Sequence, residues 1–409
     1  MTNYIILALC LLILLAYLFD VTSRYTKIPG VILLIGLGIG IQILVDTTDF
    51  SIPDMRPLLP VIGTIGLILI VMEASLDLKL GRKKFGLIVK SASAAFFLFA
   101  FFVTIMAFIM VNYLGYKLTD SLLNAIPFGI VSSAVAIPSA INFNEDQREF
   151  IIYESSLSDI IGILVFDFII IYGDSIGYGL ISFTLKGMLT ILIAVVITSA
   201  LALFLHKITY HINYVIILTS VVLVYILEEM IHLPGLLLIL AFGMALSNYK
   251  LFEHTFIKKF VDFDKFEHDL GSFSKIMSEL TFIVRSFFFI MFGYYSKITG
   301  LFDLQNVITA ACIFGGIYLL RIIFLKRSLK LPVLPFLFIS PRGLVTILLF
   351  LRIPASSRIG LINEEVVTLV ILMTILFMMI GNIFYKKEIS PETYPVDRGE
   401  EQSLDEQTF

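Results

Sequence analysis

Apolar residues occur in long runs along most of this chain, separated by short segments that carry charged or turn-forming residues. Each run approaches the length of about 20 residues that an α-helix needs to cross a lipid bilayer. The pattern therefore predicts about thirteen transmembrane helices. They lie approximately at residues 3–19, 28–45, 58–76, 85–111, 121–142, 150–172, 183–205, 213–228, 234–248, 278–296, 304–325, 332–351 and 364–385.

The composition agrees with this pattern. Hydrophobic residues make up 58% of the 409 residues, charged residues only 15%, and the mean hydropathy is +0.98. A soluble domain does not need so much apolar sequence, so the predicted fold class is an all-α polytopic membrane protein. The net charge of −3 argues against nucleic-acid binding. Cys10 and Cys312 lie inside apolar runs and the histidines do not cluster, so we expect neither a disulfide nor a cofactor or transition-metal site.

The basic residues predict the orientation. With the N-terminus outside, 19 of the 29 Lys and Arg residues fall in cytoplasmic segments and 6 in outer segments. This asymmetry is typical of membrane proteins and requires a cytoplasmic C-terminus. We therefore expect a multi-pass protein of the cell (inner) membrane. The other 4 basic residues lie inside the runs; they are Lys90, Arg285, Arg321 and Arg342.

Two of the runs contain residues that interrupt helices. The fifth holds Ser132 and Ser133 with Pro138 shortly after, and the twelfth holds Pro341 and Gly343 at its middle. Proline removes an amide donor, and backbone groups freed in this way are tolerated at membrane depth only where they line a polar cavity. If the first six and last six runs are repeats joined by the seventh, the two interrupted runs occupy equivalent positions in the two repeats. The fold expected is two inverted-topology repeats with two interrupted, crossing helices, although ordinary proline kinks are the alternative.

The segment 153–168 (YESSLSDIIGILVFDF) places a carboxylate at membrane depth. Asp159, Ser133 and Arg342 each lie about 14–18 Å along their helices, near the bilayer midplane. An acid there costs free energy unless it is paired, solvated or protonated, so a functional role is the first hypothesis. A structural acid satisfied by a neighbouring helix is the alternative. Ser155 precedes Asp159 by four residues and shares its helix face.

A second acid in this segment has a predicted partner. Glu154 and Arg321 each lie about 6 Å from the cytoplasmic ends of their helices, so they can meet as a buried ion pair. Glu154 precedes Asp159 by five residues and points elsewhere on the helix. We therefore expect Asp159 to exchange its partner while Glu154 stays paired. Arg285 lies about 10 Å in from the same side.

Several motifs resemble those of monovalent cation/proton antiporters of the sodium/proton exchanger type, over roughly residues 1–385. The segment 154–159 (ESSLSD) resembles the family's E-S-L-x-N-D, and 287–293 (FFFIMFG) resembles its F-F-F-x-x-x-G helix. The segments 341–345 (PRGLV) and 76–79 (LDLK) resemble its L-R-G-A-V stretch and the loop after its third span. Two departures concern the ion. Ser158 stands in place of the usual Asn, and Ser132-Ser133-Ala134 in place of Thr-Asp-Pro.

The resemblance implies roles and a domain organisation. Asp159 would carry a cation and a proton alternately, and Glu154 would form a salt bridge for which Arg321 is the better match. A core ion-transport domain would move against a dimerisation or scaffold domain in a homodimer. The expected parts are scaffold at 1–84 and 206–297, core at 85–172 and 298–387, a linking span at 173–205, an amphipathic interfacial helix at about 250–275, and a disordered acidic cytoplasmic tail at 388–409.

Together these residues predict a secondary active antiporter that exchanges Na⁺, or Li⁺ or K⁺, for protons. Proton and cation would compete for Asp159, and Ser155 and Ser133 with freed carbonyls would complete an oxygen shell of the kind that hard cations prefer. Further candidate ligands are Ser132 and Ser158. One titrating acid implies one proton per cation and therefore electroneutral exchange.

Other functions stay open. The first is cation-coupled transport of an organic anion, with Arg342 and Arg285 as the anion site. A membrane sensor would need a folded output domain, and only a short acidic tail follows Lys387. An intramembrane enzyme would need a nucleophile–base pair or metal ligands at membrane depth, and neither is apparent.

Overall fold

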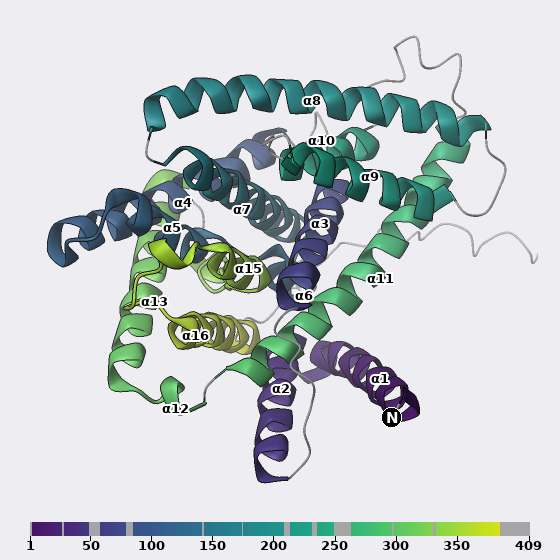
Figure 1. The fold of residues 1–409 in the computed structure, drawn as a ribbon. Helices are drawn as coiled ribbons and strands as arrows, with labels where there is room; N and C mark the ends of the chain where they lie inside the picture. Colours follow the sequence, from purple (N-terminus) through teal and green to yellow (C-terminus); the bar gives the residue numbers. More distant parts are fainter. Residues whose placement is uncertain are drawn as a thin grey trace, which may run out of the picture.

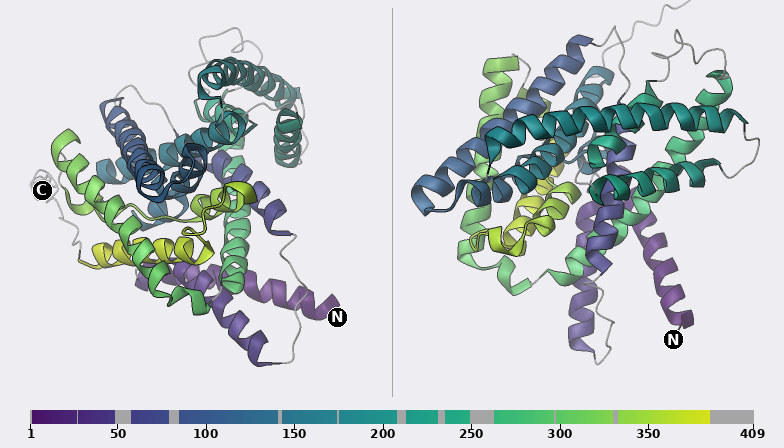
Figure 2. Two further views of the ribbon diagram at one scale, coloured as in Figure 1. Left: turned by 60° about the vertical axis from the view of Figure 1, so that its left-hand side comes forward. Right: turned by 45° about the horizontal axis from the view of Figure 1, so that its top comes forward.

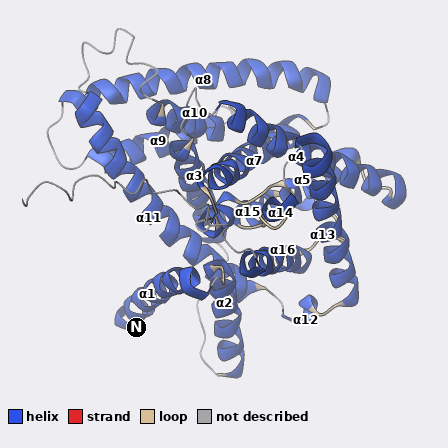
Figure 3. Cartoon of the chain, turned by 180° about the vertical axis from the view of Figure 1, so that it is seen from behind, coloured by secondary structure: helices blue, strands red, loops and turns tan. Residues whose placement is uncertain are grey.

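A computed structural model describes most of the chain. The described residues are 2–26, 28–48, 58–78, 85–140, 143–173, 175–207, 213–230, 235–248, 263–296, 298–329 and 333–384. Within these ranges every regular element is a helix (Figure 3). The prediction of an all-α fold is therefore confirmed. The tail predicted at 388–409 lies outside the described residues.

Each predicted run contains one helix, except that the fifth and the twelfth each contain two (Figure 1). The helices are α1 (Thr2–Thr26), α2 (Gly30–Thr47), α3 (Leu59–Asp77), α4 (Phe85–Leu114), α5 (Leu118–Gly129), α6 (Ser133–Ser139), α7 (Glu145–Tyr172), α8 (Ile176–Lys207), α9 (Asn213–Met230), α10 (Gly235–Ser247), α11 (Phe263–Tyr295), α12 (Ile298–Leu301), α13 (Leu304–Phe324), α14 (Val333–Phe336), α15 (Leu344–Arg352) and α16 (Glu364–Phe384). A π-helical turn, η5 (Leu325–Leu329), extends α13, and a 3₁₀ turn, η6 (Ala355–Ser357), follows α15.

The length and composition of these helices suit a membrane. Among the described residues, seven helical stretches are long and apolar enough to cross a bilayer, and five shorter apolar helices accompany them. The stretch at 118–139 counts as one span, although it is divided between α5 and α6. The protein is accordingly a multi-pass membrane protein.

A capping box sets the start of α7. The Asn144 side chain accepts a hydrogen bond from the Gln147 amide (2.9 Å), and the Gln147 side chain accepts one from the Asn144 amide. These bonds satisfy amides that the first helical turn leaves without partners. The helix therefore begins five residues before the predicted start at residue 150. Asp159 lies 14 residues after the first residue of α7 and 13 before the last, midway along the helix.

The amphipathic segment predicted at 250–275 differs in the structure. Residues 250–262 lie outside the described ranges, but 263–275 form the first turns of α11 and continue into the span without a break. Because the described part of this segment contains no proline, nothing forces the helix to end. At 33 residues, α11 is about 50 Å long, which exceeds the thickness of a bilayer core.

Two helices are interrupted at mid-span, and their breaks meet. Residues 130–132 separate α5 from α6, and residues 337–343 separate α14 from α15. The Ser132 amide donates to the Pro341 carbonyl (2.9 Å). A Cβ atom on Gly343 would lie 2.6 Å from Ser132 Oγ and 3.0 Å from Ser132 Cβ and Val135 Cγ2, so a larger residue here would force these side chains to shift. The two interrupted helices therefore cross at their breaks, as the sequence predicts.

The helices form two groups, which we call the α7 group and the α11 group. In the α7 group, α4 contacts α5, α7 and α13, while α7 contacts α6 and α15, and α13 contacts α16. Figure 2 shows α4 and α7 (blue) beside α13 and α16 (green to yellow), although they are far apart in the sequence. In the α11 group, α11 packs on α2 and α3, with α1, α9 and α10 beside them. The groups meet where α3 and α10 contact α7, and α8 runs along one edge in Figure 1.

Candidate functional site

Asp159 lies beside the helix crossing and is 1% exposed. Ser133, the first residue of α6, donates two hydrogen bonds to its Oδ2 atom, from the amide (3.1 Å) and from Oγ (2.5 Å). Within the described part of the chain, Oδ1 has no hydrogen-bond partner and the carboxylate has no basic partner. A buried carboxylate oxygen without a partner costs free energy, so this atom is suited to bind a proton or a cation.

The other candidate serines are buried and make different contacts. Ser158 Oγ accepts a hydrogen bond from the Val131 amide (2.9 Å) inside the first break. Ser155 Oγ donates to the Ile151 carbonyl one turn earlier (2.7 Å), which leaves its oxygen lone pairs available. Ser132 Oγ is buried and has no partner among the described residues.

Glu154 and Arg321 form a buried, two-pronged ion pair. Arg321 Nη1 donates to Glu154 Oε1 (2.6 Å) and Nη2 to Oε2 (2.9 Å), and the side chains are 1% and 2% exposed. Arg321 also donates to the carbonyls of Phe336 and Ile339, at the break between α14 and α15. This arginine therefore joins α13, α7 and an interrupted helix, which is the geometry of a structural pair.

Arg342 satisfies carbonyls that the two breaks set free. Its Nε donates to the Phe128 carbonyl at the end of α5 (2.7 Å), and its Nη1 donates to the carbonyl and hydroxyl of Ser340 (both 2.8 Å). The last carbonyls of a helix have no partner within it, and a buried arginine supplies one at each break. Arg342 lines a cavity of about 20 Å³ that does not contain Arg285. Arg285 lines a different cavity, of about 550 Å³.

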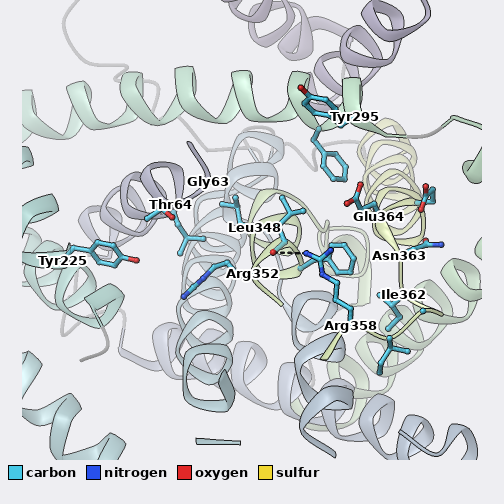
Figure 4. A pocket seen from close by; sticks show the side chains of 17 residues that line it. Gly63, Thr64, Tyr225, Tyr295, Leu348, Arg352, Arg358, Ile362, Asn363 and Glu364 are labelled. Carbon is cyan, nitrogen blue, oxygen red and sulfur yellow. Dashed lines mark hydrogen bonds between the residues drawn. The ribbon is translucent and has the colours of Figure 1, made fainter. Parts of the chain in front are cut away.

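Two larger cavities lie on either side of the helix crossing, one at the C-terminal end of α15 and one along α6. One of about 750 Å³ lies where α15 ends; Figure 4 shows Arg352, Arg358, Glu364, Tyr225 and Tyr295 around it. By the predicted orientation this is the outer side. The other, of about 550 Å³, lies along α6, and its lining includes every residue of α6 from Ala134 to Ser139 except Ala136. It lies on the predicted cytoplasmic side.

Comparison with known proteins gives the family. A sequence model described as "sodium/hydrogen exchanger, transmembrane" matches residues 10–385, most of the chain. The chain belongs to this family. Membership makes the protein a secondary transporter that exchanges cations for protons, and not an enzyme. No curated protein sequence matches the chain.

Solved structures support the fold of this exchanger. A structure of the sodium proton antiporter MjNhaP1 from Methanocaldococcus jannaschii at pH 8 is similar with a TM-score of 0.67 at 19% identity, over 92% of this chain and 95% of that chain. An electron-microscopy structure of the same antiporter has a TM-score of 0.67 at 19% identity, over 94% and 95%. At this identity the likeness shows the fold alone.

Two further features of this exchanger's polar interior involve helices that are distant in sequence. Asp167 on α7 lies 3.0 Å from Arg352 at the end of α15. Glu73 on α3 lines the cavity along α6 together with Arg285. Both placements depend on helices distant in sequence, and charge patterns within one helix carry no signal for them.

Proposed function

We propose that this exchanger moves one monovalent cation, Na⁺ or else Li⁺ or K⁺, against one proton by alternating access at Asp159. The observation that carries the proposal is the buried Oδ1 atom of Asp159, which has no hydrogen-bond partner in the described structure. A carboxylate can bind either a proton or an alkali cation through that oxygen. Because the proton and the cation cannot be bound at the same time, this competition alone couples their opposite fluxes.

The oxygen ligands of the cation would come from the residues around the crossing. The Ser133 hydroxyl contacts this carboxylate, the Ser155 hydroxyl lies on the same helix face, and the Ser132 hydroxyl is buried in the first break. Hard cations prefer oxygen ligands of this kind. Ser158 would act through its hydrogen bond to the first break. The transported species are therefore the cation and the proton, and no cofactor takes part.

The stoichiometry follows from the acids at membrane depth. Glu154 is paired with Arg321, and Asp167 lies beside Arg352, so both keep their charge partner. Of these three acids on α7, Asp159 is then the one that exchanges ligands, and one proton per monovalent cation moves no net charge. Exchange in vesicles should run at the same rate whether the membrane potential is clamped at zero or inside-negative. A rate that depends on the potential would contradict electroneutrality.

The two helix groups would provide the movement. We infer that the α7 group, residues 85–172 and 298–387, is the core that carries Asp159. The scaffold would comprise residues 1–84 and 206–297, with 173–205 as a link. The cavities on opposite sides of the crossing fit a core that exposes its carboxylate to each side in turn.

Three finer proposals concern the membrane and the assembly. The protein would lie in the cell (inner) membrane with its N-terminus outside and its C-terminus in the cytoplasm, and it would form a homodimer through the scaffold. A fluorescent protein fused to the C-terminus should be bright, and alkaline phosphatase in the same place should be inactive. Light scattering of the purified protein should give twice the chain mass of 46.0 kDa.

The decisive variant is Asp159→Asn, which keeps the shape of the side chain but cannot carry a charge. Reconstituted in vesicles with a pH gradient, the wild type should dissipate the gradient when Na⁺, Li⁺ or K⁺ is added, and the variant should not. The control is Asp167→Asn, which removes the charge of another acid on the same helix, one that lies 3.0 Å from Arg352. Dissipation by Asp159→Asn at the wild-type rate would overturn the proposal.

A further inference from the structure

Arg285 is a cationic residue on the proposed route of a cation. It lies on α11, is half-buried, and lines the cavity of about 550 Å³ that runs along α6. Its Nη1 atom donates to the Ala134 carbonyl, at a long 3.4 Å. Ala134 directly follows Ser133, which binds Asp159. The guanidinium group of Arg285, which belongs to the α11 group, therefore contacts the first turn of α6, the turn that binds the Asp159 carboxylate.

The distance between the two charges can be bounded from these contacts. The amide of Ser133 lies 3.1 Å from Asp159 Oδ2, and Arg285 Nη1 lies 3.4 Å from the Ala134 oxygen. Adding the backbone that separates these two atoms places the guanidinium within about 14 Å of the carboxylate. Much of the space between them is protein interior, where screening is weaker than in water.

We propose that Arg285, from its place in the cavity on the α6 side, sets the affinity of the exchanger for its cation by electrostatic repulsion of a cation bound at Asp159. This inference rests on the proposed function, because it takes Asp159 as the binding group. The positive charge of Arg285 disfavours a second positive charge at Asp159. Tight binding would slow release, and a fixed repulsion favours a site that empties at each turnover.

Other charged groups line the same cavity, and one of them, Arg148, provides the control. They are Asp20 on α1, Glu73 on α3, Glu279 on α11 and Arg148 on α7. Arg148 is exposed and precedes Asp159 by 11 residues of the same helix, or about 16 Å. It offers the same charge in the same cavity, but in contact with solvent, where screening is stronger. Neutralising Arg148 should therefore matter less than neutralising Arg285.

The test is a charge series at position 285, measured as Na⁺-dependent dissipation of a pH gradient in proteoliposomes at alkaline pH, where few protons compete with Na⁺ for Asp159. Arg285→Gln should lower the KM for Na⁺ about two- to sevenfold, the range that a unit charge at this distance gives between screening by water and by protein. Arg285→Glu should lower it further, and Arg285→Lys should stay within about twofold of the wild type. Arg148→Gln should also change it by less than about twofold.

The maximal rate separates this role from a structural one. A purely structural residue would change Vmax or thermal stability in every variant, the lysine included, without ordering KM by charge. If Arg285→Gln fails to fold, the Lys and Glu variants still compare opposite charges. Equal KM values for these two variants, or a KM that rises as positive charge is removed, would overturn the inference. The proposed function fails separately, by the activity of Asp159→Asn.

Discussion

Replacement of Glu154 by Gln tests the buried ion pair without touching the proposed cation site. Gln keeps the size of the side chain and one acceptor oxygen, but it leaves the Arg321 guanidinium without a negative partner. Arg321 would keep its bonds to the carbonyls of Phe336 and Ile339 (2.8 and 2.9 Å), so it cannot simply turn away to solvent. The substitution therefore leaves an uncompensated charge in the interior.

The size of the effect follows from burial. Both side chains are nearly inaccessible, at 1% and 2% exposure, and breaking a buried pair by removing one partner costs about 3–5 kcal/mol. For larger proteins each kcal/mol corresponds to a few degrees in the unfolding midpoint, so we expect Glu154→Gln to lower Tm by about 5–10 °C. Arg321→Met should cost more, because the buried carbonyls of Phe336 and Ile339 also lose their hydrogen-bond donor, at about 1–3 kcal/mol each.

The assay is the loss of monodisperse protein on heating, followed by size-exclusion chromatography in detergent, because the chain has no Trp for a fluorescence readout. The double variant Glu154→Leu, Arg321→Met should be less destabilised than the sum of its single variants, since no lone charge remains. In the cold, Glu154→Gln should keep its exchange activity. A Tm within about 2 °C of the wild type would refute the reasoning about this pair.

Three further predictions concern the helix crossing. Ser133→Ala removes a donor that stabilises the charged carboxylate, so the proton competes better for it. The KM for Na⁺ in proteoliposomes should rise about tenfold, because such a hydrogen bond contributes about 1.5 kcal/mol. Ser158→Ala should raise this KM less, because the Ser158 hydroxyl contacts the Val131 amide instead. Gly343→Ala places a Cβ atom 2.6 Å from Ser132 Oγ and 3.0 Å from Val135 Cγ2, so these side chains must shift and exchange in vesicles should slow. Exchange at the wild-type rate would show that the crossing accommodates the extra carbon. Arg342→Lys keeps the charge but cannot donate to Phe128 and Ser340 together, so its Tm in detergent should fall, and an unchanged Tm would contradict that role.

Local sequence predicts much of this fold because membrane helices must satisfy their own backbone. The thirteen apolar runs each became a helix or an interrupted pair. The interruptions were also predictable, at Ser132 and Ser133 and at Pro341 and Gly343, but the exact residues at which the helices end were not. The first break precedes Pro138, which lies inside α6, and it is held by Ser158, Pro341 and Arg342, all distant in sequence. The sequence therefore predicts that these helices break and about where, and tertiary partners decide the residue at which each helix ends.

The candidate site shows the same division. Counting residues along single helices places Asp159, Ser133 and Arg342 at one depth, and depth alone is enough to bring Glu154 near Arg321. Counting residues does not show how each helix is rotated about its axis, or how far its side chains reach toward neighbouring helices. The carbonyl partners of Arg342 and the contact of Arg285 with Ala134 both depend on that reach.

The proton released when a cation binds tests the central claim most directly. Purified exchanger in weakly buffered detergent solution is titrated with Na⁺ while the pH is recorded, across a series of starting pH values. The account predicts that proton release per bound Na⁺ grows toward one as the starting pH is lowered, and that Asp159→Asn releases none. Saturable Na⁺ binding with no proton release at any pH would contradict it.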